Sequence, residues 1–167
     1  METKLITRTD AAAVQRILES NPDYSRRVKG APSGIGAAEE ALSALPPAVD
    51  IHQKVDLGLW EGPDLVAFAD VIVGWPTDST AHIGLLITHG ARHGEGLGRA
   101  MHDAVIDYVS SHSAIQTLRL AIVDTNAEIA EPFWMKLGYE PTGEASRYAS
   151  GDVESMSRIW ARSLVAR

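Results

Sequence analysis

The stretch Ile83-Gly-Leu-Leu-Ile-Thr-His-Gly-Ala-Arg-His-Gly-Glu-Gly-Leu-Gly-Arg-Ala-Met101 decides how this chain folds. An apolar run typical of a strand ends in a glycine-rich loop, and the loop opens directly into a helical pattern. A helix N-terminus attracts anions because it presents unpaired N–H groups at the positive end of the helix dipole. Gly94, Gly96 and Gly98 lack a Cβ that would keep the backbone away from a bulky phosphate. The stretch therefore predicts a site for a phosphate or pyrophosphate group.

Length, composition and charge limit the classes of protein to which the chain can belong. Its 167 residues fit one domain over residues 1–167, and 45% hydrophobic with 22% charged residues is ordinary for a soluble protein. No run approaches the ~20 apolar residues that span a membrane, and the first residues lack the apolar core of a secretory signal. The formal charge of −7 argues against binding to nucleic acid. The absence of cysteine excludes disulfides and thiolate metal sites, and it fits the reducing cytoplasm.

Hydrophobic periodicity and turn residues predict an alternation of strands and helices. Strands are expected over residues 4–9, 52–60, 65–73, 80–88, 116–123, 139–149 and 154–164. Helices are expected over residues 10–19, 24–29, 37–45, 98–109 and 127–137. The short turns between the strands of residues 52–88 are typical of an antiparallel meander, and the whole order is that of a mixed α/β (α+β) domain. The irregular residues 21–50 form either a mobile lid or the surface edge of the domain.

Three kinds of phosphate site compete for the glycine-rich loop. A P-loop ends in Gly-Lys-Ser/Thr, whereas this loop ends in Gly98-Arg99-Ala100. A dinucleotide fingerprint needs Gly-x-Gly-x-x-Gly after the first strand of a βαβ unit, whereas this loop has alternate glycines and follows a meander. The third kind is a site for an acyl-CoA.

Two segments resemble the signatures of the GNAT family of N-acetyltransferases. His93-Gly94-Glu95-Gly96-Leu97-Gly98 is similar to the family's Arg/Gln-x-x-Gly-x-Gly/Ala loop, with His93 at the Arg/Gln position. Asn126 and then Ala130-Glu-Pro-Phe133-Trp134-Met-Lys-Leu-Gly138-Tyr139 are similar to the family's second signature, an Asn followed by a helix. The two segments stand in the family's order and at its spacing. The resemblance extends over about residues 65–149.

The resemblance implies a fold, a reaction and a set of binding residues. The fold is a central, twisted, mostly antiparallel mixed sheet of six or seven strands flanked by helices, splayed near Ile87 and residues 121–123. The reaction is attack of an amine on the thioester of acetyl-CoA, with no metal ion. Backbone N–H groups near Ile87 are then expected to polarise the acetyl carbonyl. The residues implied to bind acetyl-CoA are Leu86, Ile87, Thr88, His93, Gly94, Glu95, Gly96, Leu97, Gly98, Arg99, Asn126 and Phe133. Within this set, Glu95 is expected to point to solvent, because a carboxylate facing an anion is unfavourable.

Asp70, His82 and Trp134 are the candidate catalytic residues. Asp70 lies in an apolar strand, where a carboxylate is costly unless it is paired or functional, so it is the first candidate for the general base. The structural alternative is that the strand face of Asp70 is solvated or that Asp70 pairs with an arginine. His82 is the second candidate, and a structural role is its alternative. Trp134 stands where many family members have a Tyr that protonates the departing thiolate, and an indole cannot deliver that proton.

The partner of the reaction is an amine on a small molecule or on a protein, and no membrane or nucleic acid is expected to take part. A non-catalytic module that binds acetyl-CoA is an alternative from another class of function, and a nucleotide-binding enzyme is a third. A homodimer through the C-terminal strands is also expected. Pro132 is expected in the first turn of its helix, where a missing N–H is tolerated.

Overall fold

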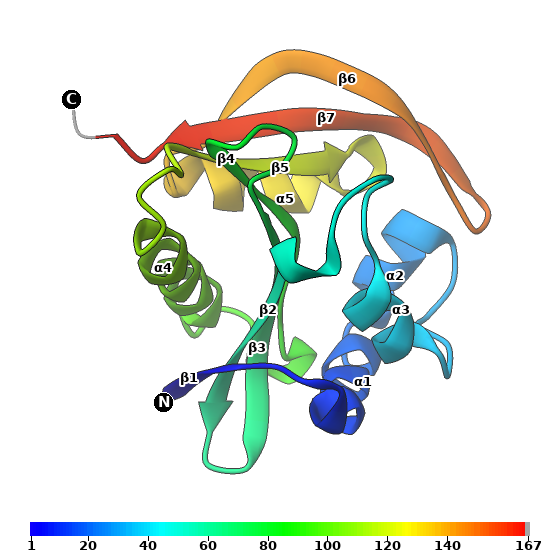
Figure 1. Ribbon diagram of the computed structural model, residues 1–167. Coiled ribbons are helices and arrows are strands. Elements are labelled where there is room, and N and C mark those ends of the chain that lie inside the picture. The colour runs from blue at the N-terminus through cyan, green and yellow to red at the C-terminus, as the bar shows by residue number, and fades with distance from the viewer. Residues whose placement is uncertain (166–167) are drawn as a thin grey trace.

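Seven strands form one sheet in the computed structural model, which describes residues 1–165 (Figure 1). The strand order is β1-β2-β3-β4-β5-β7-β6, and only β4 and β5 are parallel neighbours. This confirms the expected mixed, mostly antiparallel sheet. The strands are β1 (Glu2–Leu5), β2 (Lys54–Glu61), β3 (Asp64–Val73), β4 (Thr80–Thr88), β5 (Thr117–Val123), β6 (Glu140–Ser150) and β7 (Val153–Ser163).

Helices cover both faces of the sheet. The α-helices are α1 (Ala11–Glu19), α2 (Pro22–Lys29), α3 (Ala37–Ser43), α4 (Leu97–Ser110) and α5 (Ala127–Lys136). Short 3-10 turns are η1 (Arg8–Asp10), η2 (Ile51–Gln53), η3 (Gly90–Arg92) and η4 (Asp124–Asn126). Side chains of α4 and α5 pack on one face of the sheet, and those of α1 and α3 pack on the other. Figure 1 shows α4 on the opposite side of the central strands from α1, α2 and α3.

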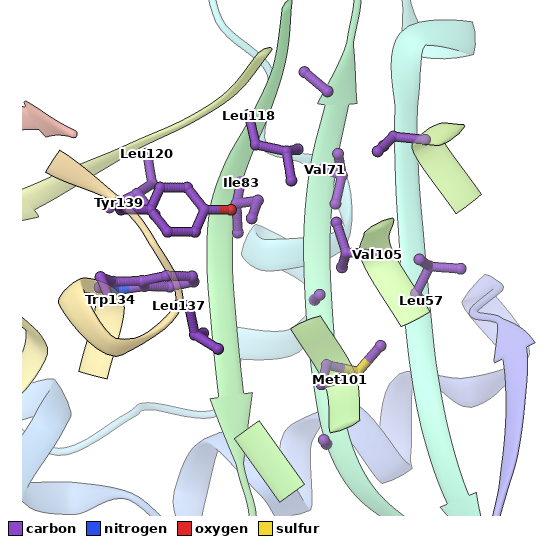
Figure 2. Packing of buried hydrophobic residues seen from close by; sticks show 14 of the residues in the cluster. Leu57, Val71, Ile83, Met101, Val105, Leu118, Leu120, Trp134, Leu137 and Tyr139 are labelled. Carbon is purple, nitrogen blue, oxygen red and sulfur yellow. The ribbon is translucent and has the colours of Figure 1, made fainter. Parts of the chain in front are cut away.

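The larger core lies between the sheet and helices α4 and α5. Met101, Val105 and Val109 follow one another at helical spacing on α4 and are fully buried. In Figure 2, Met101 and Val105 face the strands that carry Val71 and Ile83. Full burial of such a side chain stabilises the fold by roughly 1.5–3 kcal/mol. This packing fixes the direction of α4 and therefore the place of its N-terminus.

The sheet opens between β4 and β5. Their paired residues run from Thr80↔Thr117 only to Ile83↔Leu120, although β4 continues to Thr88 and β5 to Val123. Beyond the last pair the two strands part, as expected near Ile87 and residues 121–123. The opening leaves backbone groups of both strands available for a ligand.

Two local predictions are wrong. The first strand does not run over residues 4–9, because Asp10 Oδ2 accepts a hydrogen bond from the Thr7 N–H (2.9 Å) and begins the turn η1. Pro132 lies inside α5 rather than in its first turn, because the helix already begins at Ala127. A proline there removes the N–H that would bond the carbonyl of Glu128, an exposed residue that water can reach.

No helix within residues 1–165 combines the length and the apolar character needed to cross a bilayer.

Candidate functional site

The glycine-rich loop leads into the N-terminus of α4. Gly94 (φ 85°) and Gly96 (φ 80°) both adopt the left-handed region, which glycine enters without strain. A Cβ built on either residue would meet no atom within 4 Å, so both face open space. Gly96 caps α4, and the N–H groups of the following first turn have no partner within the helix. The loop therefore has the geometry of an anion site.

Gly98 serves a different purpose from the other two glycines. A Cβ on Gly98 would lie 2.9 Å from the ring of Phe133. The absence of a side chain at Gly98 therefore lets α5 pack against α4. The prediction that these glycines make room for phosphate stays a prediction for Gly94 and Gly96, whose surroundings are open, whereas the space beside Gly98 is filled by Phe133.

A cavity of about 600 Å³ lies in front of this loop. Its lining residues come from the α1–α2 junction, α2, β4, the glycine-rich loop with the start of α4, η4 and α5. They include the expected residues Leu86, Ile87, Thr88, His93, Gly94, Gly96, Leu97, Gly98, Arg99, Asn126, Phe133 and Trp134. They also include residues that the sequence did not single out, namely Asn21, Tyr24, Arg27, Arg92, Ile129, Ala130, Lys136 and Leu137. The cationic members make the cavity suited to an anionic ligand.

Charged and polar side chains hold the loop in place. Arg92 pairs with Glu95 (3.0 Å) and with Glu61 (2.8 Å). The hydrogen bonds to the two carboxylates raise the pKa of Arg92. Glu95 is therefore turned toward Arg92, and it is not among the residues that line the cavity. Asn21 is buried, approaches His93 Nε2 (3.1 Å) through its Oδ1 and donates to the Thr88 carbonyl (2.8 Å), so it joins the loop to β4.

A second, smaller cavity of about 90 Å³ occupies the opening between β4 and β5. It shares lining residues with the larger cavity, namely Tyr24, Leu86, Asn126, Ala130 and Trp134. The two cavities are therefore adjacent, and together they extend from the glycine-rich loop to the place where the strands part. At this junction Arg27 Nε donates to Asn126 Oδ1 (2.7 Å), which positions the Asn126 side chain.

Trp134 stands between the two cavities and a buried aromatic cluster. Its ring meets those of Phe133, Tyr139 and His102 edge-on, at centroid distances of 4.9, 5.1 and 5.9 Å. Figure 2 shows Trp134 beside Tyr139, whose hydroxyl is 2.8 Å from His102 Nε2. Burial lowers the pKa of His102 to about 4 and raises that of Tyr139. The hydroxyl of Tyr139 is thus committed to His102, and neither residue lines the two cavities.

Charged side chains also gather on the sheet face that α1 and α3 leave open. We call Lys54, Asp56, Asp70, His82 and Arg119 the polar face. The pairings Asp56↔Asp70, Lys54↔Ile72, Ile72↔His82 and His82↔Arg119 place them on one side of the sheet.

Asp70 lies at the centre of an ion cluster on the polar face. Lys54 Nζ donates to Asp70 Oδ1 and lies 3.7 Å from Asp56 Oδ1, with only 2% of the lysine side chain exposed. Burial, followed by the neighbouring Asp70 carboxylate, raises the pKa of Asp56 to about 8. Asp70 is therefore paired, as the structural alternative expects, but its partner is Lys54 and not an arginine.

Gly84 connects this cluster to the opening in the sheet. The register of β3 and β4 shifts at this point, since Asp70 pairs with Leu85 and Val71 with Ile83. Gly84 is exposed, and a Cβ on it would lie 2.8 Å from Asp70 Oδ2. Gly84 also lines the smaller cavity, so it separates the Asp70 carboxylate, which lines neither cavity, from the opening.

His82 occupies the other end of the polar face. Its Nδ1 accepts a hydrogen bond from Arg119 Nη1 (2.9 Å), and burial followed by the charge of Arg119 lowers the pKa of His82 to about 4. His82 is thus neutral and its Nδ1 lone pair is occupied. This arrangement favours the structural alternative for His82 over a role as proton acceptor.

Two of the missed cavity residues carry a weak signal in the sequence. Ala130 and Leu137 recur at helical spacing with the expected Asn126 and Phe133 along α5 and its two ends, which would have predicted one helix face along the cavity. Asn21, Tyr24 and Arg27 lie in the region of residues 21–50, which had no motif. Lys54 and Asp56 alternate with apolar residues and therefore look like the solvent side of a strand.

Comparisons with known proteins agree with this geometry. The sequence model described as acetyltransferase (GNAT) family matches residues 35–139. No curated protein gives a significant match to the sequence. Among solved structures, the ribosomal-protein-S18-alanine N-acetyltransferase from Escherichia coli is 20% identical over 99% of this chain and 95% of that chain, with a TM-score of 0.71.

Two further solved structures have the same fold as this chain. An acetyltransferase from Thermus thermophilus is 20% identical over 98% of both chains, with a TM-score of 0.72. An aminoglycoside 6'-N-acetyltransferase complexed with coenzyme A is 16% identical over 100% of this chain and 99% of that chain, with a TM-score of 0.70. At these identities the likeness extends to the fold alone.

Proposed function

Because this chain belongs to the acetyltransferase (GNAT) family, we propose that it transfers the acetyl group of acetyl-CoA to a primary amine by direct attack on the thioester. The observation that carries the proposal is that the two cavities share five lining residues. The larger cavity contains the N-terminus of α4, which suits an anion, and the smaller one occupies the opening between β4 and β5, where Gly84 lies next to the Asp70 carboxylate.

The larger cavity fits the CoA part of the substrate. The N–H groups after Gly96 and the cations Arg27, Arg99 and Lys136 suit its phosphates. The unpaired edge of β4 beyond Ile83 supplies N–H and carbonyl groups for an extended chain such as pantetheine, which is rich in amides. The acetyl carbonyl at the end of that chain is polarised by backbone N–H groups near Ile87 in this proposal.

The chemical step needs a proton acceptor and a defined geometry. Asp70 takes a proton from the ammonium of the acceptor, and the free amine nitrogen bonds to the thioester carbon. The nitrogen then releases its surplus proton to water as the carbon–sulfur bond breaks and the amide forms. The thiolate then takes a proton from water, because the indole of Trp134 cannot supply one. Trp134 instead forms the wall at which the two cavities meet. Holding the two reactants together at this wall accounts for much of the rate enhancement.

Parallel calorimetric titrations test the proposal first. Purified protein is titrated with acetyl-CoA, CoA, ATP and NAD, and thiol release from acetyl-CoA is then followed with a set of amines. Selective binding of acetyl-CoA and CoA, followed by release of thiol, is the expected result. Binding without turnover of any amine would instead favour a non-catalytic acetyl-CoA module. A folded protein that prefers ATP or NAD would contradict the proposal outright.

Two expectations from the sequence stay predictions of this proposal. One is a location in the cytoplasm, and the other is a homodimer through the C-terminal strands. The outer edge of β6 has no strand partner within residues 1–165, which leaves it free for such a contact.

A further inference from the structure

Arg119 is firmly held on the polar face but has no acidic partner. Its Nη1 donates to His82 Nδ1 (2.9 Å), and its guanidinium carbon lies 5.1 Å from the centre of the Trp75 ring. Trp75 and His82 meet edge-on with ring centroids 5.0 Å apart, so the three side chains form one assembly. None of the ion pairs within residues 1–165 includes Arg119.

An unpaired arginine in this setting is unfavourable by itself. Arg119 is half-buried, and the loss of water around it lowers the pKa of its guanidinium. A partly buried charge without a counter-charge costs stability. The guanidinium has five N–H donors, and His82 accepts a hydrogen bond from only one of its nitrogens. The remaining donors match a planar anion such as a carboxylate.

Arg119 lies close to the proposed acetyl-transfer site. Arg119 and His82 form the pair just before Ile83↔Leu120, where the pairing of β4 and β5 ends. Ala121 is exposed and lines the smaller cavity two residues further along β5, on the same face as Arg119. Two residues of a strand span about 6–7 Å. An acceptor that reacts beside Ala121 therefore has Arg119 within the reach of a small molecule.

Accordingly, we propose that Arg119 binds a carboxylate of the acceptor, which makes the substrate an amine that also carries a carboxylate, such as a free amino acid. The inference rests on the proposed function and deepens it. Asp70 lies on one side of Gly84 and Arg119 lies toward the other end of the polar face. The acceptor thus meets an acidic residue at its ammonium and a basic residue at its carboxylate.

Glu144 on β6 competes with such an acceptor. Its charge raises the pKa of Arg119, although it forms no ion pair with it. Glu144 is exposed and keeps its own hydration, whereas a bound substrate would exclude water from Arg119. Removal of the Glu144 charge is therefore expected to strengthen the binding of an anionic acceptor and to leave a neutral one unaffected.

The test compares amines that differ only in the carboxylate. Each free L-amino acid is paired with its amide, and binding of both to the CoA-loaded protein is measured by calorimetry, where no acetyl transfer takes place. Thiol release from acetyl-CoA with the same amines is measured separately. Wild type is compared with Arg119→Gln and Glu144→Gln, and with Arg147→Gln as a matched control, since Arg147 is exposed on β6.

We expect at least one amino acid to bind at least about tenfold more tightly than its amide. Arg119→Gln abolishes that difference without changing the KM for acetyl-CoA, Glu144→Gln increases it, and Arg147→Gln leaves it unchanged. Equal binding of acid and amide to wild type overturns the inference, as does a difference that survives in Arg119→Gln. If Arg119→Gln does not fold, an unchanged acid-to-amide ratio in Glu144→Gln overturns it. Failure of the proposed function has a distinct signature, which is the absence of thiol release with every amine.

Discussion

The glycine-rich loop follows the end of β4 and the polar face includes side chains along β4 and its neighbours, and the two regions are built in opposite ways. The loop is one contiguous segment whose backbone N–H groups do the binding, with Gly94 and Gly96 open to space. The polar face is assembled from single side chains on β2, β3, β4 and β5. Substitutions in the two regions should therefore affect different steps. The loop is expected to control affinity for acetyl-CoA, and the polar face is expected to control acceptor chemistry and the pH dependence of folding.

The largest effect is expected from Asp70→Asn. Loss of the proton acceptor lowers kcat/KM for the amine by about 10²–10⁴-fold, while the Kd for acetyl-CoA stays the same. Asparagine keeps an oxygen for Lys54, and Asp56 is then free to ionise beside that lysine, so the variant should fold. Steady-state kinetics across pH, with calorimetry for acetyl-CoA, measures both quantities.

A second variant tests the position of the Asp70 carboxylate without removing it. Gly84→Ala leaves Asp70 in the chain but places a Cβ 2.8 Å from its Oδ2, so the carboxylate must move. We expect a fall in kcat/KM in the same direction as for Asp70→Asn, again with normal acetyl-CoA affinity. Unchanged kcat/KM in Asp70→Asn across the whole pH range would remove Asp70 as the base.

The next effect concerns stability rather than activity. Asp56 has a folded-state pKa raised to about 8 from the ordinary 3.8, so between these values the folded protein holds a proton that the unfolded chain has lost. Stability therefore falls as pH rises from about 4 to 8, by at most about 1.4 kcal/mol per pH unit, and the contribution levels off above pH 8. Asp56→Asn removes this slope. Urea unfolding of both proteins at pH 5, 6 and 7 measures it, and parallel curves for the two would contradict the assignment.

The contrast between a contiguous loop and a face built from distant residues also explains which features can be predicted from the sequence. The expected strand over residues 80–88 coincides with β4, and the meander and the loop into α4 follow from turn residues and periodicity close by in the chain. The polar face depends on partners far apart, since Arg119 reaches His82 over 37 positions and Lys54 reaches Asp70 over 16. No local pattern predicts such pairs. Their members alternate with apolar residues and therefore resemble the solvent side of a strand, and only the folded sheet brings them together and buries them.

The smallest effect is expected in the loop, from Gly96→Ala. A Cβ at a positive φ strains the backbone by roughly 1–2 kcal/mol, although no neighbouring atom obstructs it. Strain in the bound loop should raise the Kd for acetyl-CoA by about 5–30-fold and leave kcat at saturating acetyl-CoA unchanged.

Gly36→Ala is the matched control for this last change. Gly36 also faces open space and also precedes a helix, but its φ of −90° suits any residue. Calorimetric titration of both variants should give a raised Kd for Gly96→Ala and a normal one for Gly36→Ala. If both bind acetyl-CoA like wild type, the left-handed turn at Gly96 contributes nothing to the anion site. If Gly96→Ala lowers kcat without raising the Kd, the loop affects catalysis and not affinity. That result would contradict the assignment of acetyl-CoA affinity to the loop and of acceptor chemistry to the polar face.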